Sequence, residues 1–195
     1  MTTPTITNDT QLATAVRQAG DLLQAISDYA GRDSRIKASV RFPRGFIRPA
    51  GEQRARLSFV NDAALRANIA YTLLLSDTVY WLLIRTDLAG TAEQMLIKLF
   101  LFIGGTMTES ITKEYLKSRC GKGYKERTEH LVRAGVISSG LKQDLDWLWD
   151  QRNNMHLFLL NTAEYTNDYN RAAHVRCVKA FRDLVDALNQ RGRLN

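Results

Sequence analysis

Apolar side chains recur every three to four residues along most of the chain, which is the spacing of an amphipathic helix. This pattern predicts helices over residues 9–30, 62–86, 92–119, 125–134, 139–156 and 168–190. Proline, which breaks helices, occurs only at positions 4, 43 and 49, so nothing prevents long helices after residue 50. We therefore expect an all-α fold, a helical bundle of about five to six helices.

The segment 32–60 does not follow this helical spacing. Its short runs 38–42 and 55–60 are rich in residues typical of strands, so we expect an irregular excursion or a small β-hairpin near 36–60. The change of pattern divides the chain in two. We expect an N-terminal helix with a basic loop or hairpin as an appendage over 1–60, and a helical bundle over 61–195.

The same segment carries most of the positive charge of the chain, whose formal net charge is +7. Residues 32–56 hold eight Lys or Arg and two Asp or Glu, and phenylalanines are interleaved with them. One interpretation is a solvated loop. The other is a nucleic-acid contact surface, in which arginines bind phosphates and aromatic rings stack on bases. The candidate nucleic-acid-binding residues are Arg41, Arg44, Arg48, Arg54 and Arg56.

The other features of the sequence indicate no metal site, no cofactor site and no membrane association. Cys120 and Cys177 are far apart, and the three histidines are scattered, so we expect no metal site and no cofactor. The polar N-terminus has no apolar signal core, which favours a cytoplasmic location. The apolar stretch 67–84 contains Asp77, and a central carboxylate is costly in a bilayer. We therefore expect a core helix there, and no membrane association.

One apolar stripe is interrupted by polar residues. In the helix predicted for 139–156, Leu141, Leu145 and Leu148 share one face. The continuation of that face reaches Arg152 and His156, where the pattern requires apolar residues. A charged side chain on such a face is costly unless it is paired or lies in a cleft or an interface. The two residues are also four positions apart, so one helical turn brings them together.

Such a pair has chemistry suited to RNA cleavage. Arginine offers a forked, permanent charge for a phosphate, and histidine transfers a proton near neutral pH. Asn153 could orient either side chain or hold a substrate oxygen. The 2′-hydroxyl of RNA would attack the adjacent phosphate while Arg152 stabilises the developing charge. The alternative is structural: Arg152 pairs with an acid of a neighbouring helix, such as Asp77 or Glu109, and His156 is a satisfied core histidine.

Residues 150–157, Asp-Gln-Arg-Asn-Asn-Met-His-Leu, resemble the signature of the HEPN superfamily (higher eukaryotes and prokaryotes nucleotide-binding domains). Members are helical bundles in which Arg-Asn, followed closely by His, lies near the end of a late helix before one more long helix. The predicted helix order is similar over 61–190. Three residues separate Arg152 from His156, fewer than in the commonest form of the motif, and Phe158 stands where members modified by a partner nucleotidyltransferase carry Tyr.

The resemblance implies a function and a set of site residues. Many members are metal-independent endoribonucleases of toxin–antitoxin, phage-defence and RNA-processing systems, and they usually form homodimers whose two motifs share one cleft. It implies Arg152 and His156 as the catalytic pair, Asn153 as the polar residue beside them, and Glu109 as an acidic residue from an earlier helix. RNA would be the substrate, and an antitoxin or another protein a candidate partner. Because inactive members exist, the alternative is a non-catalytic helical module that binds RNA, a nucleotide or a protein partner.

Overall fold

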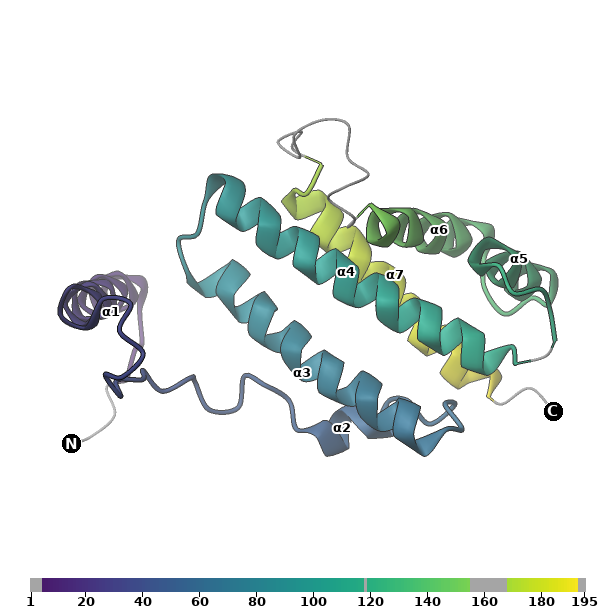
Figure 1. Cartoon of the computed structure of the whole chain (residues 1–195), viewed down its shortest axis with the longest axis horizontal. Helices are drawn as coiled ribbons and strands as arrows, with labels where there is room; N and C mark the ends of the chain where they lie inside the picture. Colours follow the sequence, from purple (N-terminus) through teal and green to yellow (C-terminus); the bar gives the residue numbers. More distant parts are fainter. Residues whose placement is uncertain (1–4, 118, 155–167, 193–195) are drawn as a thin grey trace. The chain divides into compact units, whose positions relative to one another are not determined.

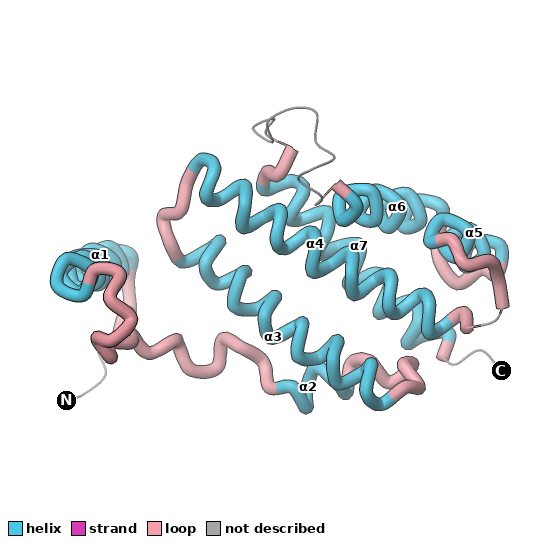
Figure 2. The backbone as a smooth tube through the Cα atoms, viewed as in Figure 1, coloured by secondary structure: helices cyan, strands magenta, loops and turns pink. Residues whose placement is uncertain are grey.

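The structure is a computed structural model that describes residues 5–117, 119–154 and 168–192. Within these residues the chain forms helices and no strand (Figures 1 and 2). The helices are α1 (Asp9–Ala30), α2 (Ala50–Ala55), α3 (Ala63–Arg85), α4 (Gly90–Tyr115), α5 (Tyr124–Arg133), α6 (Ser139–Asn153) and α7 (Arg171–Arg191). The predicted all-α fold is confirmed. The chain divides into two compact units, residues 1–43 and 44–195.

The first unit consists of α1 and the non-helical segment that follows it. The side chain of Asn8 caps the helix by accepting a hydrogen bond from the backbone N–H of Gln11, and Gly31 ends the helix with a positive φ of 54°. No residue of α1 is buried, and the apolar face that predicted the helix, including Leu12, Val16 and Ile26, is exposed. Local spacing therefore identified this helix without indicating what its apolar face packs against.

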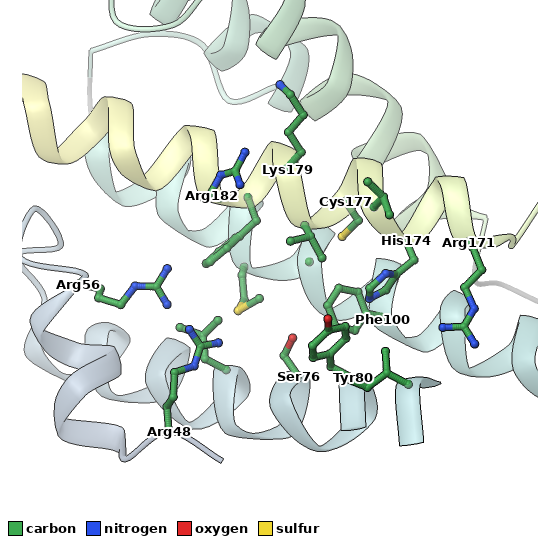
Figure 3. A pocket seen from close by; sticks show the side chains of 17 residues that line it. Arg48, Arg56, Ser76, Tyr80, Phe100, Arg171, His174, Cys177, Lys179 and Arg182 are labelled. Atoms are coloured by element: carbon green, nitrogen blue, oxygen red, sulfur yellow. The ribbon is translucent and has the colours of Figure 1, made fainter. Parts of the chain in front are cut away.

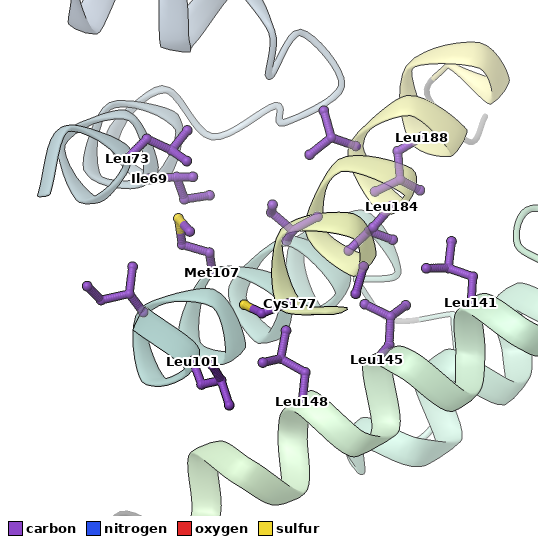
Figure 4. Close-up of a cluster of buried hydrophobic side chains, with 14 of the residues drawn as sticks. Ile69, Leu73, Leu101, Met107, Leu141, Leu145, Leu148, Cys177, Leu184 and Leu188 are labelled. Atoms are coloured by element: carbon purple, nitrogen blue, oxygen red, sulfur yellow. The ribbon is translucent and has the colours of Figure 1, made fainter. Parts of the chain in front are cut away.

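In the second unit, α4 is the central helix. It packs against α3, α5, α6 and α7, and α6 also packs against α5 and α7. Figure 1 shows α3 running beside α4 in the opposite direction. The core between these helices is mainly aliphatic (Figure 4). The predicted apolar face of α6 is confirmed, because Leu141, Leu145 and Leu148 are all buried.

Two adjacent glycines allow α6 and α7 to approach α4 closely. A Cβ atom on Gly105 would lie 2.7 Å from the Cβ of Arg152 and 3.2 Å from the carbonyl oxygen of Leu148. A Cβ atom on Gly104 would lie 2.5 Å from the Sγ of Cys177 on α7. Side chains of any other residue would push the helices apart. The glycine pair therefore fixes the helix spacing at the point where Arg152 leaves α6.

Of the two alternatives for 36–60, an irregular excursion or a β-hairpin, the described residues show the irregular backbone and no hairpin. The part of this segment before α2 is irregular, as expected, but Ala50–Ala55 is helical and no strand forms. Pro49 stands at the N-cap of α2 with φ −59°, a value that suits the start of a helix. The run 55–60 resembles a strand only because Leu57, Phe59 and Val60 are apolar. These three side chains enter the core of the bundle from a turn.

Residues 44–60 thus belong to the same compact unit as the bundle, although the sequence placed them with the appendage. A buried carboxylate on α3 holds them there. Asp77 accepts hydrogen bonds from the backbone N–H of Arg48 at 3.0 Å and from its guanidinium Nη2 at 2.6 Å. The fully buried Gln53 of α2 lies within 3.5 Å of the same carboxylate.

Two helices, α3 and α4, are long and apolar enough to cross a membrane by length and composition alone. The most apolar window of α4 is 61% buried within the chain, and that of α3 is 33% buried. Core helices of proteins without a membrane span have the same properties. The apolar character of α4 is accounted for by its central place in the bundle.

Candidate functional site

Three of the four residues that the sequence singled out come together in space. Arg152 lies in the last turn of α6, and its Nη2 is 3.3 Å from Oε2 of Glu109 on α4. Its Nη1 donates a hydrogen bond of 3.1 Å to Oδ1 of Asn153. The fourth residue, His156, lies outside the described residues, so its predicted place beside Arg152 stays a prediction. The structure therefore brings together a cation, an acid and an amide from two helices.

Two aromatic rings pack next to the guanidinium group of Arg152. The guanidinium carbon of Arg152 lies 5.0 Å from the ring centre of Trp149, one helical turn earlier, and Trp149 stacks on Tyr124 of α5 with ring centres 4.7 Å apart. Burial raises the pKa of Tyr124. The i, i+3 spacing of Trp149 and Arg152 could have revealed their contact from the sequence. Nothing in the sequence indicated Tyr124.

The arginine and the acid are both accessible to solvent. The side chain of Arg152 is 30% exposed and that of Glu109 is 27% exposed. The Nε of Arg152 is buried and has no hydrogen-bond partner among the described residues. The ion pair agrees with the structural interpretation of Arg152, whereas its exposure is what a ligand-binding arginine requires. Asp77, the other acid considered as a partner for Arg152, pairs with Arg48 instead.

This arrangement can stabilise an oxyanion. A guanidinium held by Glu109 on one edge and by the Trp149 ring on one face loses little conformational freedom when it meets a phosphate. Glu109 balances the charge while the site is empty and can accept hydrogen bonds from a ligand hydroxyl. Within the part of the chain that the structure describes, no group of three His, Cys, Asp or Glu side chains is placed to hold a metal ion.

The five candidate nucleic-acid-binding arginines have different environments. Arg44 and Arg54 are exposed on the second unit, and Arg41 is exposed on the first. Arg48 is held by Asp77, and Arg56 donates a hydrogen bond of 3.2 Å to Oε1 of Gln53. Arg48 therefore has a structural role that the charge count could not reveal. The role of the five arginines in binding nucleic acid stays a prediction.

Comparison of the chain with protein-family models, with curated proteins and with solved structures finds no match. The likeness to the HEPN superfamily therefore depends on residues 150–157 and on the order of the helices.

A second histidine lies away from Arg152, against α3 and α4. His174 of α7 is only 6% exposed and stacks on Tyr80, with ring centres 5.5 Å apart and an interplanar angle of 7°. The ring of Phe100 is 4.5 Å away. The Nε2 atom of His174 has no hydrogen-bond partner among the described residues. Burial lowers the pKa of His174, and the positive charge of Arg171 lowers it further.

His174 should make the stability of the protein depend on pH. Because its pKa is lower in the folded than in the unfolded chain, the unfolded chain binds more protons as the pH falls below about 6.5. The free energy of unfolding should therefore fall between pH 7.5 and pH 5.5, by at most ~1.4 kcal/mol per pH unit. His174→Phe should remove this slope and stabilise the fold, because it removes a buried polar atom and keeps the ring. Urea denaturation at several pH values measures both, and His130→Phe on α5 is the control that should retain the slope.

The glycine pair predicts a difference between two otherwise similar substitutions. Gly105→Ala should lower the free energy of unfolding by about 1–3 kcal/mol, because the new methyl group overlaps the Cβ of Arg152. The higher helix propensity of alanine, worth about 1 kcal/mol, is too small to offset the overlap fully. Gly140→Ala on α6, where the nearest atom is 3.9 Å away, should be neutral or stabilising. Equal thermal unfolding of the two variants would contradict the close contact.

Proposed function

We propose that the chain is a metal-independent endoribonuclease of the HEPN type. The observation that supports it most is the solvent-accessible cluster of Arg152, Glu109 and Asn153, which joins a phosphate-binding cation to an acid from an earlier helix. The resemblance of residues 150–157 to the HEPN signature implies that His156 is the catalytic histidine that acts together with this cluster. Among the described residues, α6, which carries Arg152 and Asn153, is followed in the chain by the long helix α7, in keeping with the resemblance.

The proposed reaction is an internal transfer of the phosphate. The 2′-oxygen of one nucleotide attacks the adjacent phosphorus, and the bond from phosphorus to the 5′-oxygen of the next nucleotide breaks. His156 accepts the proton of the 2′-hydroxyl, and a proton returns to the leaving 5′-oxygen, so the products are a 2′,3′-cyclic phosphate and a 5′-hydroxyl. Arg152 stabilises the negative charge that builds up on the phosphate oxygens. Glu109 orients Arg152 before the RNA binds.

In this proposal two copies of the chain form a homodimer in the cytoplasm, and their two motifs face one cleft. The exposed arginines Arg41, Arg44 and Arg54 are candidates for contacts to the RNA backbone. A toxin–antitoxin or phage-defence role follows from the resemblance, with an antitoxin as the candidate partner. The chemistry of the cluster does not depend on that role.

The decisive experiment measures RNA cleavage by the purified chain in EDTA. We expect cleavage to persist in the chelator and to leave 2′,3′-cyclic phosphate and 5′-hydroxyl ends, which end-labelling and mass spectrometry of the fragments detect. Cleavage that stops in EDTA, or that leaves 3′-hydroxyl ends, would contradict the proposal.

The ion pair itself favours one alternative, a non-catalytic helical module that binds RNA. In the described structure Glu109 already occupies an edge of the Arg152 guanidinium, as in a structural pair. Such a module would bind RNA with an affinity that falls steeply as salt rises, and it would turn over no substrate. Filter binding at several salt concentrations, run beside the cleavage assay on the same preparation, distinguishes binding alone from binding with cleavage.

A further inference from the structure

A pocket of about 650 Å³ opens between α3, α4 and α7 (Figure 3), and Arg152 is not among the residues that line it. Its volume lies within the usual range for sites that bind small organic molecules. The apolar part of its lining comes from all three helices. It includes Leu73 and Tyr80 of α3, Phe100 and Met107 of α4, and Val178 and Phe181 of α7. All of these residues belong to the second compact unit.

The lining is apolar and cationic but contains no acid. Five cations line the pocket, and no Asp or Glu is found among the described residues that do so. These cations are Arg48, Arg56, Arg171, Lys179 and Arg182. Figure 3 shows Arg48, Arg56 and Arg182 toward one end, and Tyr80, His174 and Arg171 toward the other. Arg171 is paired with Glu93. An apolar interior with three arginines at one end suits a ligand with an apolar body and an anionic head.

The charges at that end are only partly compensated within the protein. Arg48 pairs with Asp77 at 2.6 Å. Arg182 lies 3.2 Å from Asp183, and the same carboxylate pairs more closely with Lys179, at 2.6 Å. Arg56 hydrogen-bonds to the neutral side-chain oxygen of Gln53. Arg56 and Arg182 are therefore the side chains whose charge an added anion would best complement.

The other end of the pocket is aromatic. The rings of Tyr80 and His174 are stacked, and Phe100 lies against the imidazole. Tyr80 is 39% exposed, so part of its ring surface is still in contact with water. Covering this ring and the 40% exposed Val178 with a ligand would remove apolar surface from water, which favours binding.

We propose that this pocket binds a small amphipathic organic anion, with its anionic head between Arg56 and Arg182 and its apolar body over Met107, Val178 and Tyr80. The ligand class is that of fatty or aromatic acids and their phosphate counterparts, which share a single anionic head and an apolar body. The site is independent of the proposed ribonuclease reaction.

Dodecanoate, used below its micelle concentration, is the probe, and isothermal titration calorimetry on the full chain is the measurement. We expect saturable binding of one molecule per chain. Dodecanol lacks the charge, and butanoate lacks most of the apolar body. Each should bind at least about tenfold more weakly, the equivalent of one charge-assisted hydrogen bond or a few buried methylene groups. Equal affinity for dodecanoate and dodecanol, or adsorption that does not saturate, would overturn the proposal.

Variants test the location. Val178→Trp should fill the pocket and abolish binding, whereas Leu75→Trp, at an exposed position of α3 outside the lining, should leave it unchanged. Arg56→Gln together with Arg182→Gln should weaken dodecanoate about tenfold and leave dodecanol unaffected. Retained binding in the Val178→Trp variant, with an unchanged circular dichroism spectrum, would overturn the site.

Two other occupants would also overturn the proposal. Displacement of dodecanoate by a short RNA oligonucleotide, lost in Val178→Trp, would assign the pocket to RNA. A dimer in sedimentation velocity that dissociates on Val178→Trp would assign it to a second copy of the chain.

Discussion

Arg152→Ala should lower the rate of RNA cleavage by about 10²–10³-fold, because the substitution removes a positioned cation that stabilises the charge on the phosphate in the transition state. His156→Ala should lower it by about 10²–10⁴-fold, the usual contribution of a general acid or base. Initial rates on a fluorescent RNA in EDTA, taken as kcat/KM, measure both effects. Arg152→Lys should recover little activity, because a lysine ammonium lacks the fork that binds two phosphate oxygens.

Two residues of α5 provide matched controls. Arg133 is an exposed arginine and His130 is a histidine of the same chain, and neither belongs to the cluster around Arg152. Arg133→Ala and His130→Ala should cleave RNA at the rate of the unmodified chain. If these controls lose as much activity as Arg152→Ala, the cluster is not the site of cleavage.

The structural alternative predicts a different result for the same variants. If Arg152 serves only to pair α6 with α4, then Arg152→Ala and Glu109→Gln should destabilise the fold to a similar extent. Any loss of cleavage should then follow the fraction of folded protein. We expect instead that Arg152→Ala keeps a cooperative thermal transition while cleavage is lost. The half-exposed ion pair is worth about 1 kcal/mol or less.

Local periodicity was sufficient to predict most of the fold and part of the candidate site. The apolar face of α6 continues into Arg152, and this polar interruption predicts the position of the cluster. Glu109 is a candidate both as a structural partner of Arg152 and, through the resemblance to HEPN proteins, as an acid of the site, and it is the acid that pairs with Arg152. The helical positions succeeded because burial on one face imposes a period of 3.6 residues, which any chain must display.

Long-range pairing could not be read from the sequence. Asp77 was considered a partner for Arg152, but it pairs with Arg48, which the charge pattern had assigned to a nucleic-acid surface. The sequence could not decide the partner of Arg152 or the role of Arg48, because many arginines and acids can pair. Sequence spacing restricts such pairs only within one helix. The supposed hairpin failed for a related reason. Leu57, Phe59 and Val60 are apolar because a turn enters the core there, and a short apolar run of this kind is also typical of a buried strand.

The Arg48–Asp77 pair leads to the largest expected effect on stability. Asp77 is 6% exposed and accepts hydrogen bonds from the backbone and the guanidinium group of Arg48. Arg48→Ala leaves this buried carboxylate without its positive partner, so the free energy of unfolding should fall by about 3–5 kcal/mol. Urea denaturation followed by circular dichroism measures the loss. Arg54→Ala, at an exposed position of α2, should change it by about 0.5 kcal/mol or less.

A second substitution identifies the cause of that loss. Asp77→Asn in the Arg48→Ala background removes the uncompensated charge and keeps a side chain of the same size near Gln53, so it should recover much of the lost stability. If the double variant is as unstable as the sum of the two single variants, the cost comes from lost packing of the arginine stem, and the buried charge is not its origin. If Arg48→Ala costs no more than Arg54→Ala, Arg48 is available to bind an anion. The segment 44–60 is then held on the bundle mainly by other contacts, among them the buried Leu57, Phe59 and Val60.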